Sequence, residues 1–463
     1  MKSFNLHSIS PIDGRYSKKT KILKAYFSEF SLIYHRLKIE IYWLKSLINN
    51  KKIKNLYKLN HKENKYLKKI LNNFNESEAK KIKNYEKKTN HDLKAIEYYL
   101  KDKFKKSKIL QQYIPYIHFA CTSEDINNLS YTIMIKNAIQ YVIEPILSKT
   151  INSILTLGKK HNNIPMLSRT HGQPASPTTI GKEMVVFLSR LKHQKSQLSK
   201  INLSAKFNGA VGNYNAHIIA FPKINWIKHC KKFINSFKIS FNNYTTQIEP
   251  HDNIAELCHV MVRINNILLD YTKDIWYYIS INYFSLKFFS KETGSSTMPH
   301  KNNPIEFENA EGNLSLSNTL FAYFANKLTK SRLQRDLSGS TILRNIGVPF
   351  SHTIIAYKSI IKGNKKIIIN HGTIKKDLNN NWGIMSEAIQ TIMRKYKIPN
   401  AYEKIKKITR GKKTNKNNIK KIIKDLNLPI KIKNKLNKLN PEKYIGLSKL
   451  LSGNFYKNFN KNI

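Results

Sequence analysis

The sequence has little cysteine, no long apolar run and few acidic residues, and each shortage excludes a class of protein. Its three cysteines, Cys121, Cys230 and Cys258, lie far apart and include no Cys-x-x-Cys pair, which argues against a disulfide framework or a metal site. No run of about eighteen apolar residues is available to span a membrane. Residues 1–10 contain no apolar core of signal-peptide length. We therefore expect a cytoplasmic protein with no metal and no membrane partner.

Acidic side chains are scarce, because 29 Asp and Glu face 81 Lys and Arg, a formal net charge of +52. Such an excess first suggests a nucleic-acid partner, since basic groups bind phosphates. The lysines, however, occur in every segment rather than in one patch, and no zinc finger or RNA-recognition motif is visible. We interpret the charge as a general enrichment in Lys, Asn and Ile, and we expect no specific nucleic-acid partner.

The pattern of apolar residues indicates an all-α protein of several domains. A chain of 463 residues that is 41% hydrophobic can bury more than one core. From Leu257 to Tyr278 the apolar residues alternate steps of four and three, the spacing of a helical bundle. Residues 305–328 also have a helical pattern. The predicted domains are an N-terminal helical domain, a central bundle of long helices and a small C-terminal helical domain, at 1–112, 113–364 and 365–463.

One stretch, residues 294–304, concentrates hydrogen-bonding groups where no helix or strand can form. It reads Gly-Ser-Ser-Thr-Met-Pro-His-Lys-Asn-Asn-Pro, and its glycine and two prolines break regular structure. Helical patterns flank it on both sides, and loops held by rigid elements often carry function. Further polar clusters lie near residues 89–92, 118–128, 168–174, 244–252 and 332–345. One site built from all of them requires long helices or several subunits.

These segments resemble a known family. Residues 294–304 fill every fixed position of the fumarase/aspartase superfamily signature, Gly-Ser-Ser-x-Met-Pro-x-Lys-x-Asn-Pro. Other clusters, in the same order, resemble those of bacterial adenylosuccinate lyases: Asp13-Gly14-Arg15-Tyr16, Asn90-His91-Asp92, Thr122-Ser123-Glu124-Asp125, Arg169-Thr170-His171-Gly172-Gln173-Pro174 and Arg335-Asp336. The resemblance covers nearly the whole chain and is weakest after about residue 365. It implies a homotetramer with a central helical bundle, active sites shared between subunits, small-molecule nucleotide substrates and no cofactor.

The resemblance also implies a reaction: elimination of fumarate from adenylosuccinate, and from the succinylated aminoimidazole carboxamide ribonucleotide SAICAR, leaving AMP and AICAR. Ser295 matches the base and His171 the general acid. The succinyl end is assigned to Lys301, Asn303, Thr122 and Ser123. The phosphate is assigned to Arg15, Tyr16, Arg335, Ser340 and Arg344. The substrate between these ends is assigned to His91 and Gln247, and the other binding residues are Asn90 and Asp92. The alternatives are another lyase of the superfamily, such as an argininosuccinate lyase or a carboxymuconate cycloisomerase, and a basic nucleic-acid-binding protein.

Overall fold

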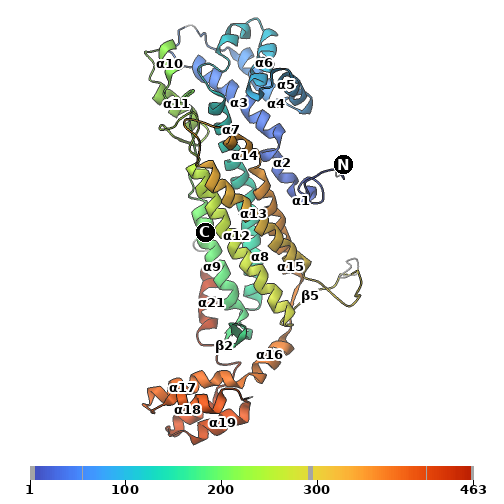
Figure 1. The fold of residues 1–463 in the computed structure, drawn as a ribbon, viewed down its shortest axis with the longest axis vertical. Helices are drawn as coiled ribbons and strands as arrows, with labels where there is room; N and C mark the ends of the chain where they lie inside the picture. The colour runs from blue at the N-terminus through green and yellow to red at the C-terminus, as the bar shows by residue number, and fades with distance from the viewer. Residues whose placement is uncertain (1–5, 55, 290–295, 413, 460–463) are drawn as a thin grey trace. The chain divides into compact units, whose positions relative to one another are not determined.

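The computed structural model describes residues 6–54, 56–289, 296–412 and 414–459, and helices dominate it (Figure 1). The helical elements up to residue 143 are α1 (Ser17–Thr20), η1 (Lys21–Leu23), α2 (Lys24–Phe27), α3 (Glu29–Ile48), α4 (His61–Asn72), α5 (Glu76–Thr89), α6 (Asp92–Lys105), η2 (Leu110–Tyr116), α7 (Ser123–Ala138) and the π-helical turn η3 (Ile139–Ile143). The next are α8 (Glu144–Lys160), α9 (Ile180–Leu198), α10 (Asn215–Ala220), α11 (Trp226–Asn235), α12 (Asp252–Ser280), α13 (Ile305–Leu328), α14 (Ser338–Leu343) and α15 (Gly347–Lys366). The last are α16 (His371–Asn380), η4 (Trp382–Ile384), α17 (Met385–Lys395), α18 (Ala401–Thr409), α19 (Lys416–Asp425), α20 (Ile430–Lys438) and α21 (Ser448–Asn458).

Strands contribute little to the described part of the chain. They form three two-stranded pairs: β1 (Pro165–Thr170) with β2 (Gln173–Thr179), β3 (Ser204–Ala205) with β4 (Ser240–Phe241), and β5 (Phe284–Leu286) with β6 (Ile367–Ile369). The first and third pairs are antiparallel and the second is parallel. The prediction of an all-α protein is therefore confirmed.

The long helices follow the predicted apolar spacing. On α12 the side chains of Leu257, Met261, Ile264, Leu268, Tyr271 and Ile275 are fully buried. Helix α13 has the bounds that its sequence predicted, Ile305–Leu328. Polar residues also join these helices, because a buried amide or hydroxyl needs a partner. Asn265 on α12 donates to Ser317 on α13 and to Thr353 on α15, at 3.2 and 3.4 Å.

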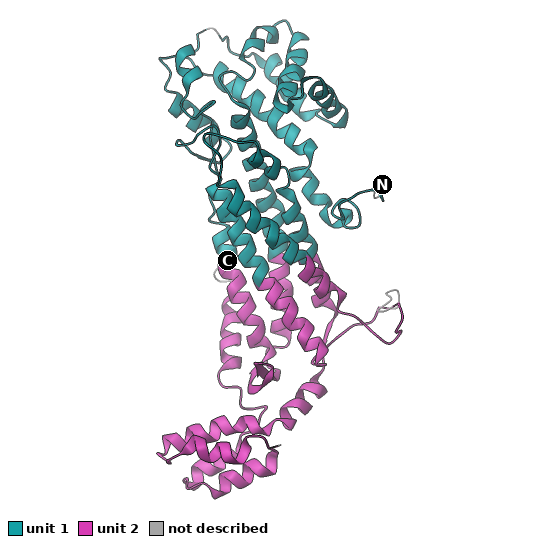
Figure 2. Cartoon of the chain, in the orientation of Figure 1, with its two compact units in different colours: residues 1–147, 194–266, 313–356 teal, residues 148–193, 267–312, 357–463 magenta. Residues whose placement is uncertain are grey.

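The chain divides into two compact units, shown in separate colours in Figure 2. Unit 1 comprises residues 1–147, 194–266 and 313–356, and unit 2 comprises residues 148–193, 267–312 and 357–463. Within unit 1 a large core joins α3, α4, α6, α7 and α11 around Trp43. Within unit 2 the helices from η4 to α20 share a small core of their own around Ile389 and Ile419. The predicted boundaries near residues 112 and 364 stay a prediction.

Candidate active site

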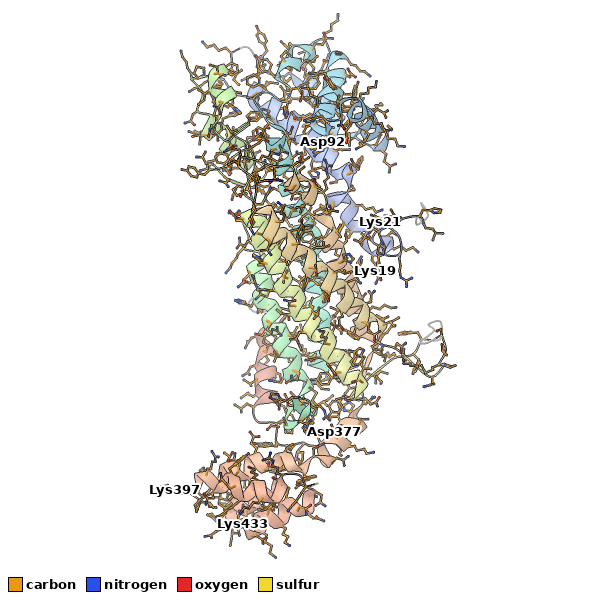
Figure 3. All side chains as sticks on the ribbon, in the orientation of Figure 1. Lys19, Lys21, Asp92, Asp377, Lys397 and Lys433 are labelled. Carbon is orange, nitrogen blue, oxygen red and sulfur yellow. The ribbon has the colours of Figure 1, made fainter. Side chains whose placement is uncertain are left out.

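The first polar cluster of unit 1 surrounds Asp92, the first residue of α6 (Figure 3). Its carboxylate lies 2.8 Å from the Arg36 guanidinium and 3.0 Å from that of Arg344. Burial alone would raise the pKa of Asp92, but the Arg36 charge and hydrogen bonds from Leu93 N and Arg344 hold it below its usual value. Two cations and one anion leave a net positive charge here, which favours an anionic ligand.

The residues beside Asp92 have structural roles as well. Asn90 ends α5 in the left-handed conformation, with φ of 49°. His91 is the N-cap of α6, where its ring nitrogen Nδ1 accepts a hydrogen bond from Lys94 N at 3.2 Å. Its side chain is about half exposed, at 52%. The cap uses only Nδ1, so the other ring nitrogen, Nε2, has no part in it.

Arg344 also borders a cavity of about 420 Å³ in unit 1. The cavity lies between the N-terminal segment and α15, and its lining residues include Ser10, Asp13, Lys24 and Ser351. Tyr16 is the N-cap residue of α1, a few residues away, and the Lys19 ammonium lies over its ring, 5.6 Å from the centroid. Arg15 is exposed and Ser340, on α14, is half-buried. The structure thus places the Arg344 guanidinium with Asp92 and Arg36, and the Arg344 backbone N–H donates to Ser340 O at 3.4 Å at the end of α14.

The second polar cluster of unit 1 forms at the start of α7. Thr122 and Asp125 make a capping box there, in which Thr122 N donates to Asp125 Oδ2 at 2.9 Å. Glu124 points its carboxylate at Arg335, with Oε2 and Nη2 3.4 Å apart. Arg335 Nη1 also donates to Gln247 Oε1 at 2.9 Å. Three of the predicted binding segments, those of Ser123, Gln247 and Arg335, therefore lie together.

Glu124 is a carboxylate of this cluster whose pKa is changed by burial. Its side chain is buried, and burial raises the pKa of Glu124 to about 7, although the Arg335 and Lys206 charges act in the opposite direction. The open side of the cluster is a cavity of about 430 Å³, lined by Gln247, Leu333, Gln334, Arg335, Asp336 and Leu337. A buried acid beside a half-buried guanidinium forms a site whose charge depends on pH and on ligand binding.

His171 lies in unit 2 at the tip of the β1–β2 hairpin. Thr170 pairs with Gln173, so His171 and Gly172 form a two-residue turn, with φ of 53° and 72°. Positive φ at both positions is the geometry of a type I′ turn, which suits glycine and costs a histidine about 1 kcal/mol. The turn exposes the imidazole. The sequence predicted only a polar break before a helix here, and the hairpin explains why the break is rigid.

A carboxylate on α16 holds this hairpin in place. Asp377, labelled in Figure 3, lies on this helix. Its Oδ2 accepts hydrogen bonds from Arg169 Nη2 and from Tyr283 Oη, both at 2.5 Å. Asn381 Nδ2 donates to Asp377 Oδ1 at 2.9 Å. Because Arg169 is two residues before His171, these contacts limit how far the imidazole can move.

The described part of the signature loop, residues 296–304, also belongs to unit 2. Lys301 N donates to Met298 O at 3.0 Å, and Asn303 O accepts from Ile305 N at 2.9 Å, which joins the loop to the start of α13. Asn302 Nδ2 donates to Leu286 O at 3.1 Å. The Lys301 side chain is exposed and that of Asn303 is half-buried. Ser295 lies outside the described residues.

Comparison with known proteins decides the family. The sequence model described as Lyase matches residues 14–316, and the one described as Adenylosuccinate lyase C-terminal matches residues 331–445. The adenylosuccinate lyase of Legionella pneumophila (strain Corby) is 59% identical over 443 residues, covering 96% of this chain and 97% of the relative. The chain belongs to the adenylosuccinate lyase family. The adenylosuccinate lyases of Buchnera aphidicola subsp. Schizaphis graminum and Escherichia coli (strain K12) are 53% and 46% identical, each over 96% of this chain and over 97% and 98% of their own lengths.

Solved structures support the fold of this adenylosuccinate lyase family member. The 3-carboxy-cis,cis-muconate lactonizing enzyme from Pseudomonas putida has a TM-score of 0.75 at 15% identity, covering 95% of this chain and 97% of the other. Fumarate lyase from Mesorhizobium sp. BNC1 has the same score and identity, with 94% and 97% covered. The fumarase/aspartase-like fold is confirmed. None of the helices in the described ranges is long and apolar enough to cross a bilayer. In those same ranges, no group of three or more His, Cys, Asp or Glu side chains is arranged to hold a metal ion.

Two residues of this family member's candidate site, Arg36 and Glu124, were not predicted from the sequence. Arg36 lies among apolar residues of α3, so neither spacing nor motif signals it, and only its contacts with Asp92 and Asn127 reveal it. Glu124 belongs to the Thr-Ser-Glu-Asp cluster but had no assigned role. The place of Glu124 within this polar motif could have suggested a functional role. Its burial beside Arg335 could not be predicted from the sequence.

Proposed function

We propose that the chain eliminates fumarate from adenylosuccinate to give AMP, and from SAICAR to give AICAR, by general acid–base β-elimination. The observation that carries this proposal is the identity to adenylosuccinate lyases over nearly the whole chain. The paired guanidinium groups of unit 1 add to it, since both substrates carry a ribose phosphate and guanidinium groups bind phosphate in a bidentate manner.

The proposed chemistry moves two protons, one from the carbon next to the carbon that bears the nitrogen and one to the departing nitrogen. Ser295 takes the proton from the carbon next to a carboxylate, the carbon–nitrogen bond breaks, and the double bond of fumarate forms. His171 gives a proton to the departing nitrogen. Lys301 and Asn303 bind the carboxylate beside that carbon, where negative charge develops during proton removal. Thr122 and Ser123 hold the same succinyl end.

The remaining residues are assigned to the nucleotide end. Arg335 and Arg344 bind the phosphate, and both are already partly neutralised, by Glu124 and by Asp92. An incoming phosphate therefore competes with a carboxylate for each guanidinium, which favours a dianion over a monoanion. Arg15, Tyr16 and Ser340 complete the phosphate site. Asn90, His91, Asp92 and Gln247 position the rest of the substrate.

We further propose that the chain forms a homotetramer through its long helices, with active sites shared between subunits. Helix α13 supports this, because residues 302–326 contain neither lysine nor arginine in a chain of net charge +52. Its outward side chains include Ile305, Leu316 and Tyr323, each about half exposed, at 53%, 55% and 51%. Gly312 and Ala322 are also exposed on α13. Exposed apolar side chains on a helical stretch without basic residues are typical of a subunit interface. The cytoplasmic location, the absence of a cofactor and the three-domain division stay predictions.

The direct test is to incubate the purified protein with adenylosuccinate and follow fumarate release. Argininosuccinate, followed by fumarate release, and a carboxymuconate lactone, followed by opening of its ring, serve as control substrates for the alternative lyases. Reaction with adenylosuccinate alone supports the proposal, whereas reaction with a control substrate alone refutes it. Tight binding of a structured RNA that persists at high salt, without fumarate release, would favour the nucleic-acid alternative.

Shared active sites have a separate test. Ser295→Ala and His171→Ala chains should each lose at least about a hundredfold in rate, the usual scale of one acid–base group. When the two are unfolded and refolded together, hybrid tetramers should regain activity. Random equal mixing would restore about a quarter of the sites if each site draws the two residues from different subunits. Hybrids that form but remain as inactive as their parents would show that both residues come from one chain.

A further inference from the structure

A fully buried ion pair lies behind the second polar cluster. Lys206 Nζ and Asp125 Oδ1 are 3.1 Å apart, and neither side chain is exposed to solvent. Two charges buried in this way are costly unless hydrogen bonds complete their coordination. Their position, directly beneath three segments assigned to substrate binding, raises the question of what they do there.

Each proton of the Lys206 ammonium has an acceptor. Besides Asp125, the ammonium donates to Gly209 O and to Gln247 O, both at 2.8 Å. An ammonium has three protons, so these contacts satisfy it completely. The group therefore ties the backbone of residue 247, in the segment between β4 and α12, to the turn that follows β3.

The Asp125 carboxylate is equally well occupied. Oδ2 accepts from Thr122 N at 2.9 Å and from Gly209 N at 3.1 Å, and Oδ1 accepts from Asn208 N at 3.1 Å. Gly209 has φ of 83°, a conformation that other residues adopt with strain. Asp125 thus joins the start of α7 to the same turn that Lys206 contacts.

These contacts continue to the surface and close a ring. Gln247, held through its carbonyl by Lys206, accepts from Arg335 through its side chain at 2.9 Å. Arg335 in turn contacts Glu124, which is next to Asp125 on α7. The ring passes through four segments that are distant in sequence, and the fully buried ion pair is its inner side.

We propose that Lys206 and Asp125 are positioning residues, which fix the position of Thr122 and Ser123 relative to Gln247 and Arg335 in the substrate site. This role rests on the proposed function. Neither side chain touches substrate, because both are enclosed. Their charges act through Gln247 and through the N-terminus of α7, and a shift of about 1 Å between such groups can cost up to a hundredfold in rate.

The test compares Lys206→Met with Leu67→Ala. Leu67 is buried on α4 in the same unit, on a helix without an assigned site residue, so its truncation should destabilise the unit without disturbing the site. Both variants are assayed for fumarate release well below their Tm values, with rates corrected for the folded fraction. We expect the KM for adenylosuccinate to rise at least about tenfold in Lys206→Met and to stay unchanged in Leu67→Ala.

A second variant covers the case in which Lys206→Met fails to fold. Gly209→Ala adds a methyl group with ordinary contacts to the His217 ring, 3.5 Å away, but strains the turn that both charges share. Its KM should rise in the same direction. A KM within about threefold of wild type in the folded variant overturns the positioning role and leaves the ion pair a purely structural feature. A wild-type chain that releases no fumarate instead refutes the proposed function, so the two failures are distinguishable.

Discussion

Replacing Glu124 by glutamine should stabilise the folded chain at alkaline pH and change its stability little at acidic pH. Glu124 is only 4% exposed, and burial raises its pKa from 4.5 to about 7. The charged groups around it are Arg335 after α13, Lys206 after β3, Asp125 on α7 and Arg36 on α3. The positive charges of Arg335, Lys206 and Arg36 lower the pKa of Glu124 and partly offset the effect of burial. The Asp125 carboxylate raises this pKa further.

The magnitude follows from the two pKa values. The folded chain binds this proton more tightly than the unfolded chain, so the resulting stabilisation is complete below pH 4.5 and is lost as pH rises through about 7. The difference between the pKa values of 4.5 and about 7 corresponds to about 3 kcal/mol of folding stability, at roughly 1.4 kcal/mol for each pH unit. Glutamine has no proton to lose, so Glu124→Gln escapes this penalty. Its advantage over wild type should grow by about 2.5 kcal/mol between pH 5 and pH 8, because part of the penalty is already present at pH 5.

Urea unfolding at the two pH values measures this difference, with both proteins at one chain concentration, because assembly contributes to stability. Glu256→Gln, at an exposed position of α12, serves as the matched control. Comparing the change between the two pH values in Glu124→Gln with that in Glu256→Gln removes any effect of the amide that does not depend on pH. If Glu124→Gln changes the free energy of unfolding equally at both pH values, the carboxylate ionises as it does in the unfolded chain. Burial would then not raise the pKa of Glu124.

Two further predictions concern the ligand and the assembly. Arg335→Met should weaken binding of AMP far more than binding of fumarate, since only AMP carries a phosphate; calorimetry measures both, and equal losses would remove the phosphate assignment. Leu316→Lys places a positive charge in the stretch of α13 that has no basic residue and should convert the tetramer into smaller species; sedimentation measures this, and an intact tetramer would place the interface on another surface.

Much of the fold and the family could be predicted from the sequence, because their signals are local. An apolar stripe such as Leu257 to Ile275 specifies both a helix and its buried face, since spacing along the chain becomes direction around the helix. The bounds of α13 follow from the proline before it and the apolar pattern within it. The signature at 294–304 is likewise continuous in sequence, so its functional groups can be recognised from the sequence alone.

The tertiary structure alone decided which groups meet. Arg344 and Asp92 are 252 positions apart and Arg335 and Gln247 are 88 apart, and no periodicity connects such pairs. Arg36 and Lys206 carry no motif, and each became part of the site only through buried contacts with carboxylates. The raised pKa of Glu124 has the same origin, because desolvation depends on what surrounds a residue rather than on its neighbours in sequence. Local chemistry therefore determined which residues could act, and long-range packing determined their partners and charge states.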